Sequence, residues 1–410
     1  MKHFLRRLLP FVVIATQSVT AMAQDGSFNP DDHAVFTTDR ADGRYASTRA
    51  YLHHIMKARE PRLKYNPAMS ADSMKLWQSD MAQTMSRLMK HPDRDLSSLP
   101  APVLVSEEQR DGYTLQHWEL YPLDQAVVPF LVLVPDAVNN TNNRAPGILC
   151  IPGYGQPKEF LIDDNNPHAM ARLYAREGYV AVVMDNPGQG ETGDLEREAG
   201  KGVDLVTVGR QLLEMDWNYL GLSSYIGSLL TDWMKTQPYI NPERLVVSGF
   251  SLGAEPLMAI GLMHPEVYAF VYNDYLCATR ERALTMTKPD SRGNRPWPNN
   301  IEHLIPGFLL EFDFPDILAA LAPRPLICTE GGMDRDFYLI SGAYEKAGAP
   351  EAFEYHHYAK YTDPSSRTYL DAAPEGINRD EHFRLANVDP PHHYFKDEFI
   401  LPWLRHILSK

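Results

Sequence analysis

The chain has 410 residues, 44% of them hydrophobic, and carries a formal net charge of −14 at neutral pH. This length accommodates one large domain with insertions or two ordinary domains, and the hydrophobic content is sufficient for a substantial core, which excludes a disordered protein. The acidic balance argues against a nucleic-acid partner. It fits a neutral or weakly charged substrate better, although a local basic pocket could still hold a carboxylate.

The first 23 residues have the three parts of a secretory signal peptide. A basic stretch ending at Arg7 precedes an apolar run over residues 8–19 and the small-residue segment Ala21-Met22-Ala23. We expect cleavage after Ala23, which removes three positive charges and changes the formal charge from −14 to −17. No later segment offers the roughly 18 unbroken apolar residues of a membrane span. The sequence therefore predicts a periplasmic or secreted protein with no membrane span in its mature chain.

The three cysteines, Cys150, Cys277 and Cys328, are too few and too scattered for a disulfide framework or a zinc cluster. Cys150 and Cys328 lie in apolar runs typical of central strands, so we expect both to be buried as small hydrophobic side chains. Nothing in the sequence implies a metal ion or an organic cofactor.

Residues 24–101 are predicted to form an N-terminal helical extension. Within residues 41–91, apolar side chains recur at three- and four-residue spacing, which is typical of helices that pack one face on a neighbouring domain. These positions include Tyr51, Ile55, Met56, Leu76, Met81, Met85, Leu88 and Met89. The extension carries no clear chemistry.

From residue 102 onward, short strands and then alternating helices and strands are expected. The expected strands are 114–121, 127–134, 147–151, 179–184, 244–248, 269–272, 325–329 and 351–358, and the expected helices are 168–177, 206–235, 252–263, 316–321, 337–346 and 396–408. Strands that alternate with helices of this length indicate a mostly parallel central sheet covered by helices on both faces. We therefore expect one α/β domain over residues 102–410.

Two stretches interrupt this alternation. Residues 280–306 are polar and contain several prolines, and residues 360–391 are mostly polar without a clear period. Loops of this length within a compact domain usually have a function or are mobile. Both insertions are therefore candidates for shaping a substrate pocket.

Ser251 is the central residue of Gly249-Phe250-Ser251-Leu252-Gly253, which follows the apolar strand over 244–248 and precedes a predicted helix. This is the context of a nucleophile elbow, in which the strand turns sharply into the helix and exposes the serine hydroxyl. Glycines flank the serine because a side chain would clash in so tight a turn. The helix N-terminus and the Leu252 N–H group would stabilise negative charge on the reacting oxygen.

A serine nucleophile needs a histidine base that is oriented by a carboxylate. In folds with a nucleophile elbow, these residues follow one another along the chain in the order serine, acid, histidine. Asp334 follows the strand over 325–329 and the turn Gly331-Gly332, so it is the expected acid. Asp336 lies two residues further on. Asp274 ends the preceding strand, which some members of the superfamily use instead.

The base is expected just before the last helix, where this chain has His392 and His393. We favour His393. His382 remains an alternative, because the long insertion could itself present a base. His356 and His357 fall in a predicted strand and His406 in the last helix, which favours packing or surface roles.

The second oxyanion-hole donor is expected in the glycine-rich segment 151–156, directly after a predicted strand. The backbone N–H of Tyr154 is the favoured donor, with Gly155 as the alternative. The segment 185–192 contains a Gly-x-Gly fragment but lacks the third glycine and the lysine of phosphate-binding loops. It is interpreted as a tight loop beside the elbow.

At three places the sequence resembles the acetyl-xylan-esterase-like α/β-hydrolases of gram-negative bacteria. The matching stretches are Gly249-Phe250-Ser251-Leu252-Gly253-Ala254-Glu255-Pro256, the run from Ile305-Pro306-Gly307 through Phe314-Pro315-Asp316-Ile317 to Ala322-Pro323-Arg324-Pro325, and Glu330-Gly331-Gly332-Met333-Asp334. The resemblance extends from about residue 111 to the C-terminus. It implies Ser251 as nucleophile, Asp334 as acid and a late histidine as base.

The chain departs from these relatives at two catalytic loops. Many carry His-Gly at the oxyanion loop and Gly-Gly-His before the last helix, where this chain has Pro152-Gly153 and Pro391-His392-His393. Neither change removes a catalytic atom. Leu252 stands where glucuronoyl esterases have arginine, which argues against that activity.

These observations predict an exported serine esterase of the α/β-hydrolase fold that removes acetyl or other small ester groups from a carbohydrate. The alternatives are a methyl or feruloyl esterase, for which Arg280 and Arg282 could bind a carboxylate, and a catalytically inactive fold that binds glycan. The substrate expectation follows from the resemblance alone. The acyl group, the sugar and the oligomeric state stay open.

Overall fold

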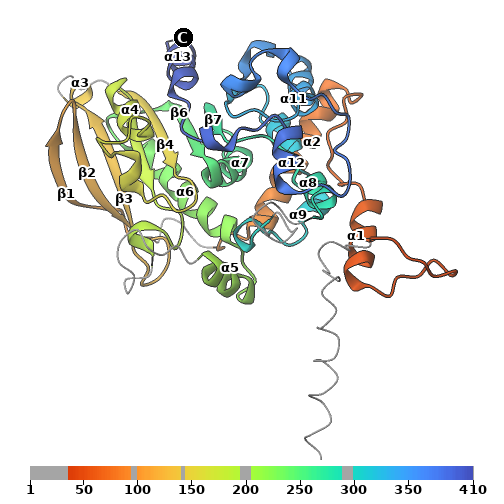
Figure 1. Ribbon diagram of the computed structural model, residues 1–410. Helices are drawn as coiled ribbons and strands as arrows, with labels where there is room; N and C mark the ends of the chain where they lie inside the picture. The colour runs from red at the N-terminus through yellow and green to blue at the C-terminus, as the bar shows by residue number, and fades with distance from the viewer. Residues whose placement is uncertain (1–35, 94–98, 140–143, 194–204, 289–298, 410) are drawn as a thin grey trace, which may run out of the picture.

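The computed structural model describes residues 36–93, 99–139, 144–193, 205–288 and 299–409 (Figure 1). The expected signal peptide lies outside these residues, and so does part of the first expected insertion. None of the helices in the described ranges is long and apolar enough to cross a bilayer.

A mixed sheet of nine strands runs through the described part of the chain, in the order β1-β2-β3-β5-β4-β6-β7-β8-β9. The first four strands in this order, β1, β2, β3 and β5, pair antiparallel with one another. From β5 onward, through β4, β6, β7 and β8 to β9, every neighbouring pair is parallel. The strands are β1 (Val103–Arg110), β2 (Tyr113–Leu120), β3 (Val128–Pro135), β4 (Ala145–Ile151), β5 (Val180–Met184), β6 (Ile240–Phe250), β7 (Ala269–Asn273), β8 (Leu326–Cys328) and β9 (Phe353–Tyr355). In Figure 1 the antiparallel strands lie at the left of the molecule.

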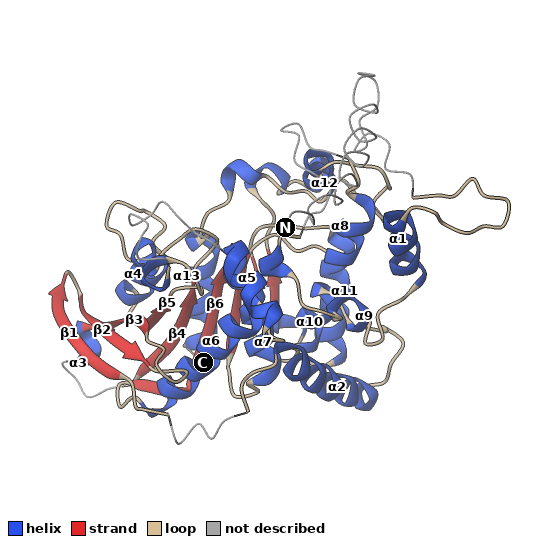
Figure 2. Ribbon diagram, turned by 90° about the horizontal axis from the view of Figure 1, so that it is seen from below, coloured by secondary structure: helices blue, strands red, loops and turns tan. Residues whose placement is uncertain are grey.

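Helices cover both faces of this sheet (Figure 2). They are α1 (Thr48–Ala58), α2 (Ala71–Met89), α3 (Asp136–Asn139), α4 (Met170–Arg176), α5 (Leu205–Glu214), α6 (Tyr219–Thr236), α7 (Ala254–Met263), α8 (Thr279–Thr285), α9 (Phe308–Glu311), α10 (Phe314–Ala320), α11 (Asp334–Lys346), α12 (Arg379–Leu385) and α13 (Asp397–Leu408). One core lies between the sheet and α2, α6, α7, α10 and α11, and the other between the sheet and α4 and α13.

The two cores divide the side chains of each central strand between them. Leu149 and Ile151 of β4 belong to the first core, whereas Ile148 and Cys150 belong to the second. This is the two-residue period of a strand that is buried on both faces, and it explains the unbroken apolar runs in the sequence. The predicted mostly parallel sheet with helices on both faces is confirmed. Strand β1 was not predicted, because its eight residues are all exposed and mostly polar.

The N-terminal helix α2 shares the main core. Its buried hydrophobic residues belong to the same cluster as those of α6 and α7; they are Met74, Trp77, Met81, Met85, Leu88 and Met89. Two side chains near the start of α6 bind the last turn of α2. Asn218 donates from Nδ2 to the Leu88 carbonyl at 2.9 Å, and Trp217 donates from Nε1 to the Met89 carbonyl at 2.9 Å.

Asn218 also caps α6, because its Oδ1 accepts the backbone N–H of Gly221 at 2.8 Å. We expect Asn218→Ala to lower the free energy of unfolding by about 2 kcal/mol, since it removes an N-cap and leaves a buried carbonyl without its donor. Asn218→Asp, which keeps the cap oxygen but places a carboxylate oxygen against the buried Leu88 carbonyl, should also be less stable than the wild type. Urea unfolding measures both.

The matched control is Asn165→Ala, because Asn165 is exposed and its side chain bonds only to Asp163. It should change the free energy of unfolding by less than about 0.5 kcal/mol. A loss for Asn218→Ala no larger than this would show that the junction between α2 and α6 contributes little.

Candidate active site

Ser251 lies at a strained turn between β6 and α7. Its φ is +52°, in the left-handed region, which costs a residue other than glycine about 1–3 kcal/mol. The flanking glycines are required by close approaches. A Cβ on Gly249 would lie 2.2 Å from the Gly253 carbonyl oxygen, and a Cβ on Gly253 would lie 2.2 Å from the Ile151 oxygen. The turn therefore lies directly against the end of β4, and neither Gly249 nor Gly253 can be replaced by a larger residue without a clash.

Ser251 opens into a cavity of about 740 Å³. The same cavity is lined by His393, Leu252, Tyr154 and Asp274. The structure thus brings together five residues that the sequence singled out from four separate segments. A volume of this size is typical of sites that bind a small molecule or part of a larger one.

The imidazole of His393 lies beside the residue that precedes the serine. Its ring stacks on Phe250 with a centroid distance of 4.6 Å, and its Nδ1 is hydrogen-bonded to a carboxylate oxygen of Glu330. Burial lowers the pKa of His393, but the hydrogen bond to Glu330 and the negative charges of Glu330 and Asp274 outweigh burial, so the pKa is raised above its usual value. An Nδ1–H that donates to a carboxylate leaves Nε2 as the proton acceptor.

Glu330 was not identified as a site residue from the sequence. It is fully buried and follows β8 by two residues. Its Oε1 accepts the backbone N–H of Tyr394 at 3.1 Å and lies 3.4 Å from the ammonium of Lys396. Its position at the carboxyl end of a parallel strand is the signal that could have found it, because the triad acid is expected there.

Asp334, the expected acid, has other partners. Its Oδ1 accepts hydrogen bonds from His357 Nε2 at 3.1 Å and from Arg367 at 2.8 Å. The chain reverses at Gly331 and Gly332, which have φ values of +68° and +149°, and this turn carries Asp334 to the start of α11. Within the described residues the carboxylate bonded to His393 is that of Glu330, not that of Asp334. Asp334 instead binds the second insertion, to which Arg367 belongs.

The two alternative acids have different surroundings. Asp336 is buried in α11, contacts Arg335 at 3.3 Å, and has a pKa that burial raises to about 6. Asp274 follows β7, and its carboxylate lies within 4.8 Å of ligand atoms of Glu330 and His393. Burial raises its pKa to about 7, against the opposing positive charge of His393. Of the two, only Asp274 reaches the proposed base.

The alternative histidines lie elsewhere. His382 is buried in α12 and neither ring nitrogen has a partner among the described residues; burial lowers its pKa to about 4. It does not line the cavity. The ring of His392 is exposed and contacts Asp389 at 2.8 Å.

The loop after β4 is fixed by hydrogen bonds that leave Tyr154 at the cavity. The N–H of Gly153 donates to Gln156 Oε1 at 3.2 Å, and the N–H of Gly155, the alternative oxyanion donor, is taken by Gln189. Asn186 adds a bond from Nδ2 to the Pro152 carbonyl at 2.6 Å. The loop after β5 therefore supports the loop after β4, as expected of a segment beside the elbow.

A buried ion pair anchors this supporting loop, and the sequence did not reveal it. The ammonium of Lys158 lies 3.0 Å from Asp185 Oδ2, and both side chains are fully buried. A Cβ on Gly190 would lie 2.3 Å from Asp185 Oδ1, so the Gly-x-Gly fragment makes room for this carboxylate.

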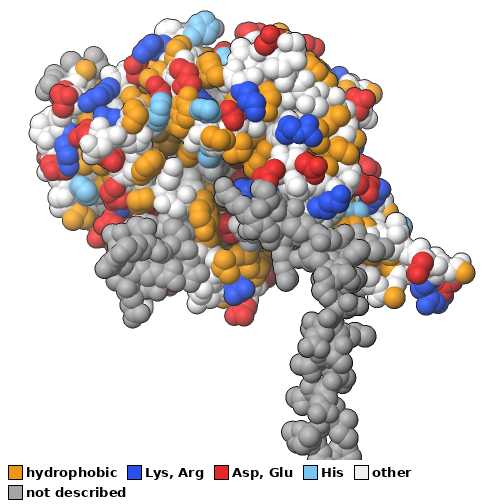
Figure 3. All heavy atoms as spheres, in the orientation of Figure 1, with side chains coloured by type: hydrophobic (Ala, Val, Ile, Leu, Met, Phe, Trp, Pro, Cys, Tyr) orange, Lys and Arg blue, Asp and Glu red, His pale blue; other side chains and the backbone are white. Residues whose placement is uncertain are grey.

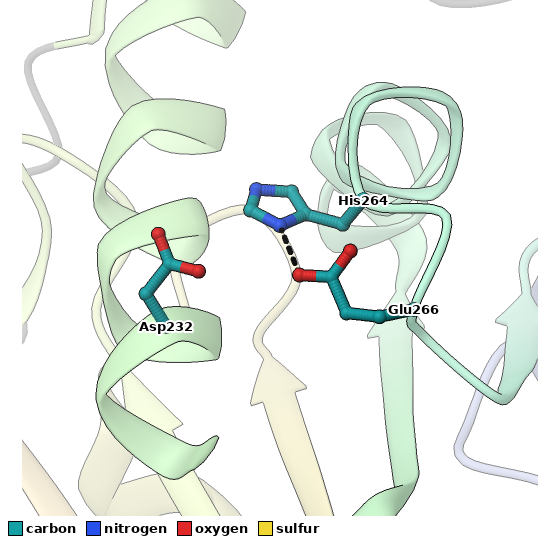
Figure 4. Close-up of side chains that lie close together, drawn as sticks. All are labelled: Asp232, His264 and Glu266. Atoms are coloured by element: carbon teal, nitrogen blue, oxygen red, sulfur yellow. Dashed lines mark hydrogen bonds and ion pairs between the residues drawn. The ribbon is translucent and has the colours of Figure 1, made fainter. Parts of the chain in front are cut away.

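Two groups of side chains in the described residues have ligand atoms close enough to hold a cation. Asp274, Glu330 and His393 form one, but the hydrogen bonds from His393 and Tyr394 already occupy the oxygens of Glu330. The other group consists of Asp232 on α6 and of His264 and Glu266, which follow the C-terminal end of α7 (Figure 4). There the ammonium of Lys235 lies 2.6 Å from Asp232 and 2.7 Å from Glu266 and compensates their charge.

Comparisons with known proteins identify the family of this chain. A model of the Abhydrolase family matches residues 27–406, which include the helical extension. The crystal structure of a proposed acetyl xylan esterase from Bacteroides fragilis NCTC 9343 is 46% identical, with a TM-score of 0.88 over 93% of this chain and 100% of that one. No curated protein matches the sequence.

More distant structures include a glucuronoyl esterase from Solibacter usitatus, 14% identical, which covers 73% of this chain and 92% of its own with a TM-score of 0.48. Acetyl Xylan Esterase 1 from Thermoanaerobacterium sp. JW/SL YS485 is 16% identical and covers 74% and 90%, with a TM-score of 0.44. The family model and the Bacteroides fragilis structure confirm the resemblance noted in the sequence. The chain belongs to the Abhydrolase family and is a carbohydrate-esterase-like α/β-hydrolase.

Proposed function

We propose that this protein is a serine esterase that removes acetyl or other small acyl groups from a carbohydrate. The observation that carries the proposal is the position of Ser251, at a strained elbow in the cavity that His393 also lines, with His393 bonded to a buried carboxylate. Strained backbone of this kind is found at functional sites, where the surrounding structure holds it in place.

In the proposed mechanism Ser251 Oγ attacks the ester carbonyl while His393 Nε2 takes its proton. The oxyanion is held by the N–H groups of Leu252 and Tyr154, and the alcohol leaves with the proton from His393. Water then attacks the acyl-serine by the same route in reverse, with His393 again as the base. The acid of the triad in this proposal is Glu330, because its carboxylate is the hydrogen-bond partner of His393.

The carbohydrate substrate rests on the similarity to the proposed acetyl xylan esterase, which matches 93% of this chain over its own full length. Export is proposed from the first 23 residues, which have the pattern of a signal peptide.

The proposal is tested with p-nitrophenyl acetate. Ser251→Ala should lower kcat by about a thousandfold or more, because no other group can form the acyl intermediate. A serine-reactive phosphonate should add one adduct to the wild type, located on Ser251 by peptide mass spectrometry, and none to the variant. The matched control is Ser228→Ala on α6, whose buried hydroxyl has no partner among the described residues. Equal rates for wild type and Ser251→Ala would contradict the serine mechanism.

The choice of acid is tested by comparing Glu330→Gln with Asp334→Asn. Glu330→Gln should lower kcat by about 10³–10⁴-fold, because the base loses the carboxylate that orients it, and should also lower the free energy of unfolding, since the buried Lys396 loses its charged partner. Asp334→Asn should keep kcat within about tenfold of wild type but lower the free energy of unfolding by about 3 kcal/mol, since Arg367 loses its buried partner. Steady-state kinetics separates the two variants, and urea unfolding measures the loss of stability in each. The opposite pattern would return Asp334 to the triad.

The pH dependence tests the role of Asp274. The imidazole acts as a base only when neutral, so kcat/KM should fall as the pH drops through the raised pKa of His393. Asp274→Asn removes a negative charge that helps to raise this pKa, so the acid limb of kcat/KM should move to lower pH. The control is Asp111→Asn at an exposed carboxylate. An unmoved acid limb would mean that Asp274 does not act on His393.

A further inference from the structure

Beyond the proposed catalytic residues, the cavity beside Ser251 has a basic wall. Arg282 of α8, Lys288 just after α8, and Arg379 at the start of α12 all line it. The chain as a whole is acidic, with a formal charge of −14, and acidic and basic side chains are mixed over the face shown in Figure 3. Three carboxylates, Glu255, Asp274 and Glu302, line the same cavity, so the basic character belongs to this wall and not to the whole lining.

The two polar insertions join to build this wall, and Figures 1 and 2 both draw α8 and α12 side by side. Met286 and Ile377 form a parallel β-bridge, and the backbone N–H of Lys288 donates to the Ile377 carbonyl at 3.2 Å. A Cβ on Gly376 would lie 3.9 Å from the Lys288 ammonium. This pairing fixes Lys288 next to the segment that leads into Arg379.

Arg282 is held in place by neutral groups. Its guanidinium donates to the hydroxyl of Tyr275 and to Asn299 Oδ1, and its Nε is buried without a partner among the described residues. No carboxylate in the described part of the chain forms an ion pair with it. Arg280, by contrast, donates to the carbonyls at the end of α1, including that of Met56 at 2.6 Å, and so has a structural role.

The acidic groups of the cavity are bonded mainly to other residues near it, although the negative charge of Glu255 also acts on Arg282. Glu255 accepts a hydrogen bond from His303 Nδ1 at 2.7 Å, and Glu302 accepts one from Asn300 at 3.2 Å and lies 3.9 Å from the other nitrogen of His303. Asp274 lies with His393 and Glu330. None of these carboxylates forms an ion pair with Lys288 or Arg379 in the described residues.

We propose that Arg282, Lys288 and Arg379 form an anion subsite, so that the preferred substrate carries a free carboxylate on a sugar near the ester that is cleaved. The inference rests on the proposed esterase function and specifies its substrate class: an acylated oligosaccharide that contains an acidic sugar. A guanidinium can bind a carboxylate through two parallel hydrogen bonds, and the two outer cations attract it over a longer range. In this arrangement the ester lies at Ser251, and the carboxylate of the acidic sugar binds at the basic wall.

The test compares two substrates that differ in one group: an acetylated xylo-oligosaccharide bearing glucuronic acid, and the same oligosaccharide after reduction of that carboxyl group to an alcohol. The readout is the ratio of the two kcat/KM values for each enzyme. For the wild type we expect a ratio of about ten in favour of the acidic substrate, mostly through KM, and a decrease of this ratio as salt is added.

The variant combines Lys288→Gln with Arg379→Gln. Both residues are exposed, so the variant should fold like the wild type, and thermal unfolding checks this. Its ratio should fall below about two, because the variant removes the two exposed charges that attract the carboxylate. The matched control is Lys360→Gln with Arg384→Gln. These two residues are also exposed and belong to the second insertion, but they do not line the cavity. The control changes the net charge equally and should keep the wild-type ratio.

A wild-type ratio near one, an unchanged ratio in the cavity variant, or an equal fall in the control would each overturn the anion subsite. The hydrolysis of p-nitrophenyl acetate by the wild type is measured in parallel. Its absence would overturn the esterase function itself, whereas its presence with a wild-type ratio near one would overturn only the subsite.

Discussion

The close approach of three backbone segments around Ser251 is the constraint on which the site depends. Gly249 meets Gly253 across the turn, and Gly253 meets the end of β4 at Ile151. These contacts hold because β4 and β6 are adjacent parallel strands, with Ile151 paired to Gly249. The parallel register therefore places the loop after β4, with Tyr154, next to the serine. The strain at Ser251 is tolerated because two buried cores hold both strands in place.

The same edge of the sheet brings together the groups that surround His393. Glu330 follows β8, Asp274 follows β7, and the segment before α13 places the imidazole against Phe250. Two carboxylates beside one imidazole raise its pKa, and burial raises the pKa of Asp274 to about 7. The pKa values of His393 and of Asp274 are therefore both raised at this edge of the sheet.

The insertions give the cavity its chemical character. Asp334 at the start of α11 binds Arg367 of the second insertion, and the bridge between Met286 and Ile377 ties that insertion to the first. The basic wall is thus held by contacts between the insertions and α11, and not by the residues around His393. Asp334, which the sequence suggested as the acid, therefore holds the second insertion in place, while Glu330 is the carboxylate bonded to His393.

The sequence by itself determined the fold class and singled out Ser251 as the proposed nucleophile, because both are recorded in local patterns. Strand and helix periods follow from which side chains are buried, and the glycines around Ser251 mark a turn that no other residue permits. It also singled out His393, which the structure brings to the cavity. The partner of that histidine was decided only by the tertiary structure. Glu330 and Asp334 are four residues apart and alike in chemistry, and the reversal at Gly331 and Gly332 sends one to His393 and the other to Arg367. The joining of two distant insertions was likewise decided by tertiary contacts, since no local period in either segment encodes its partner.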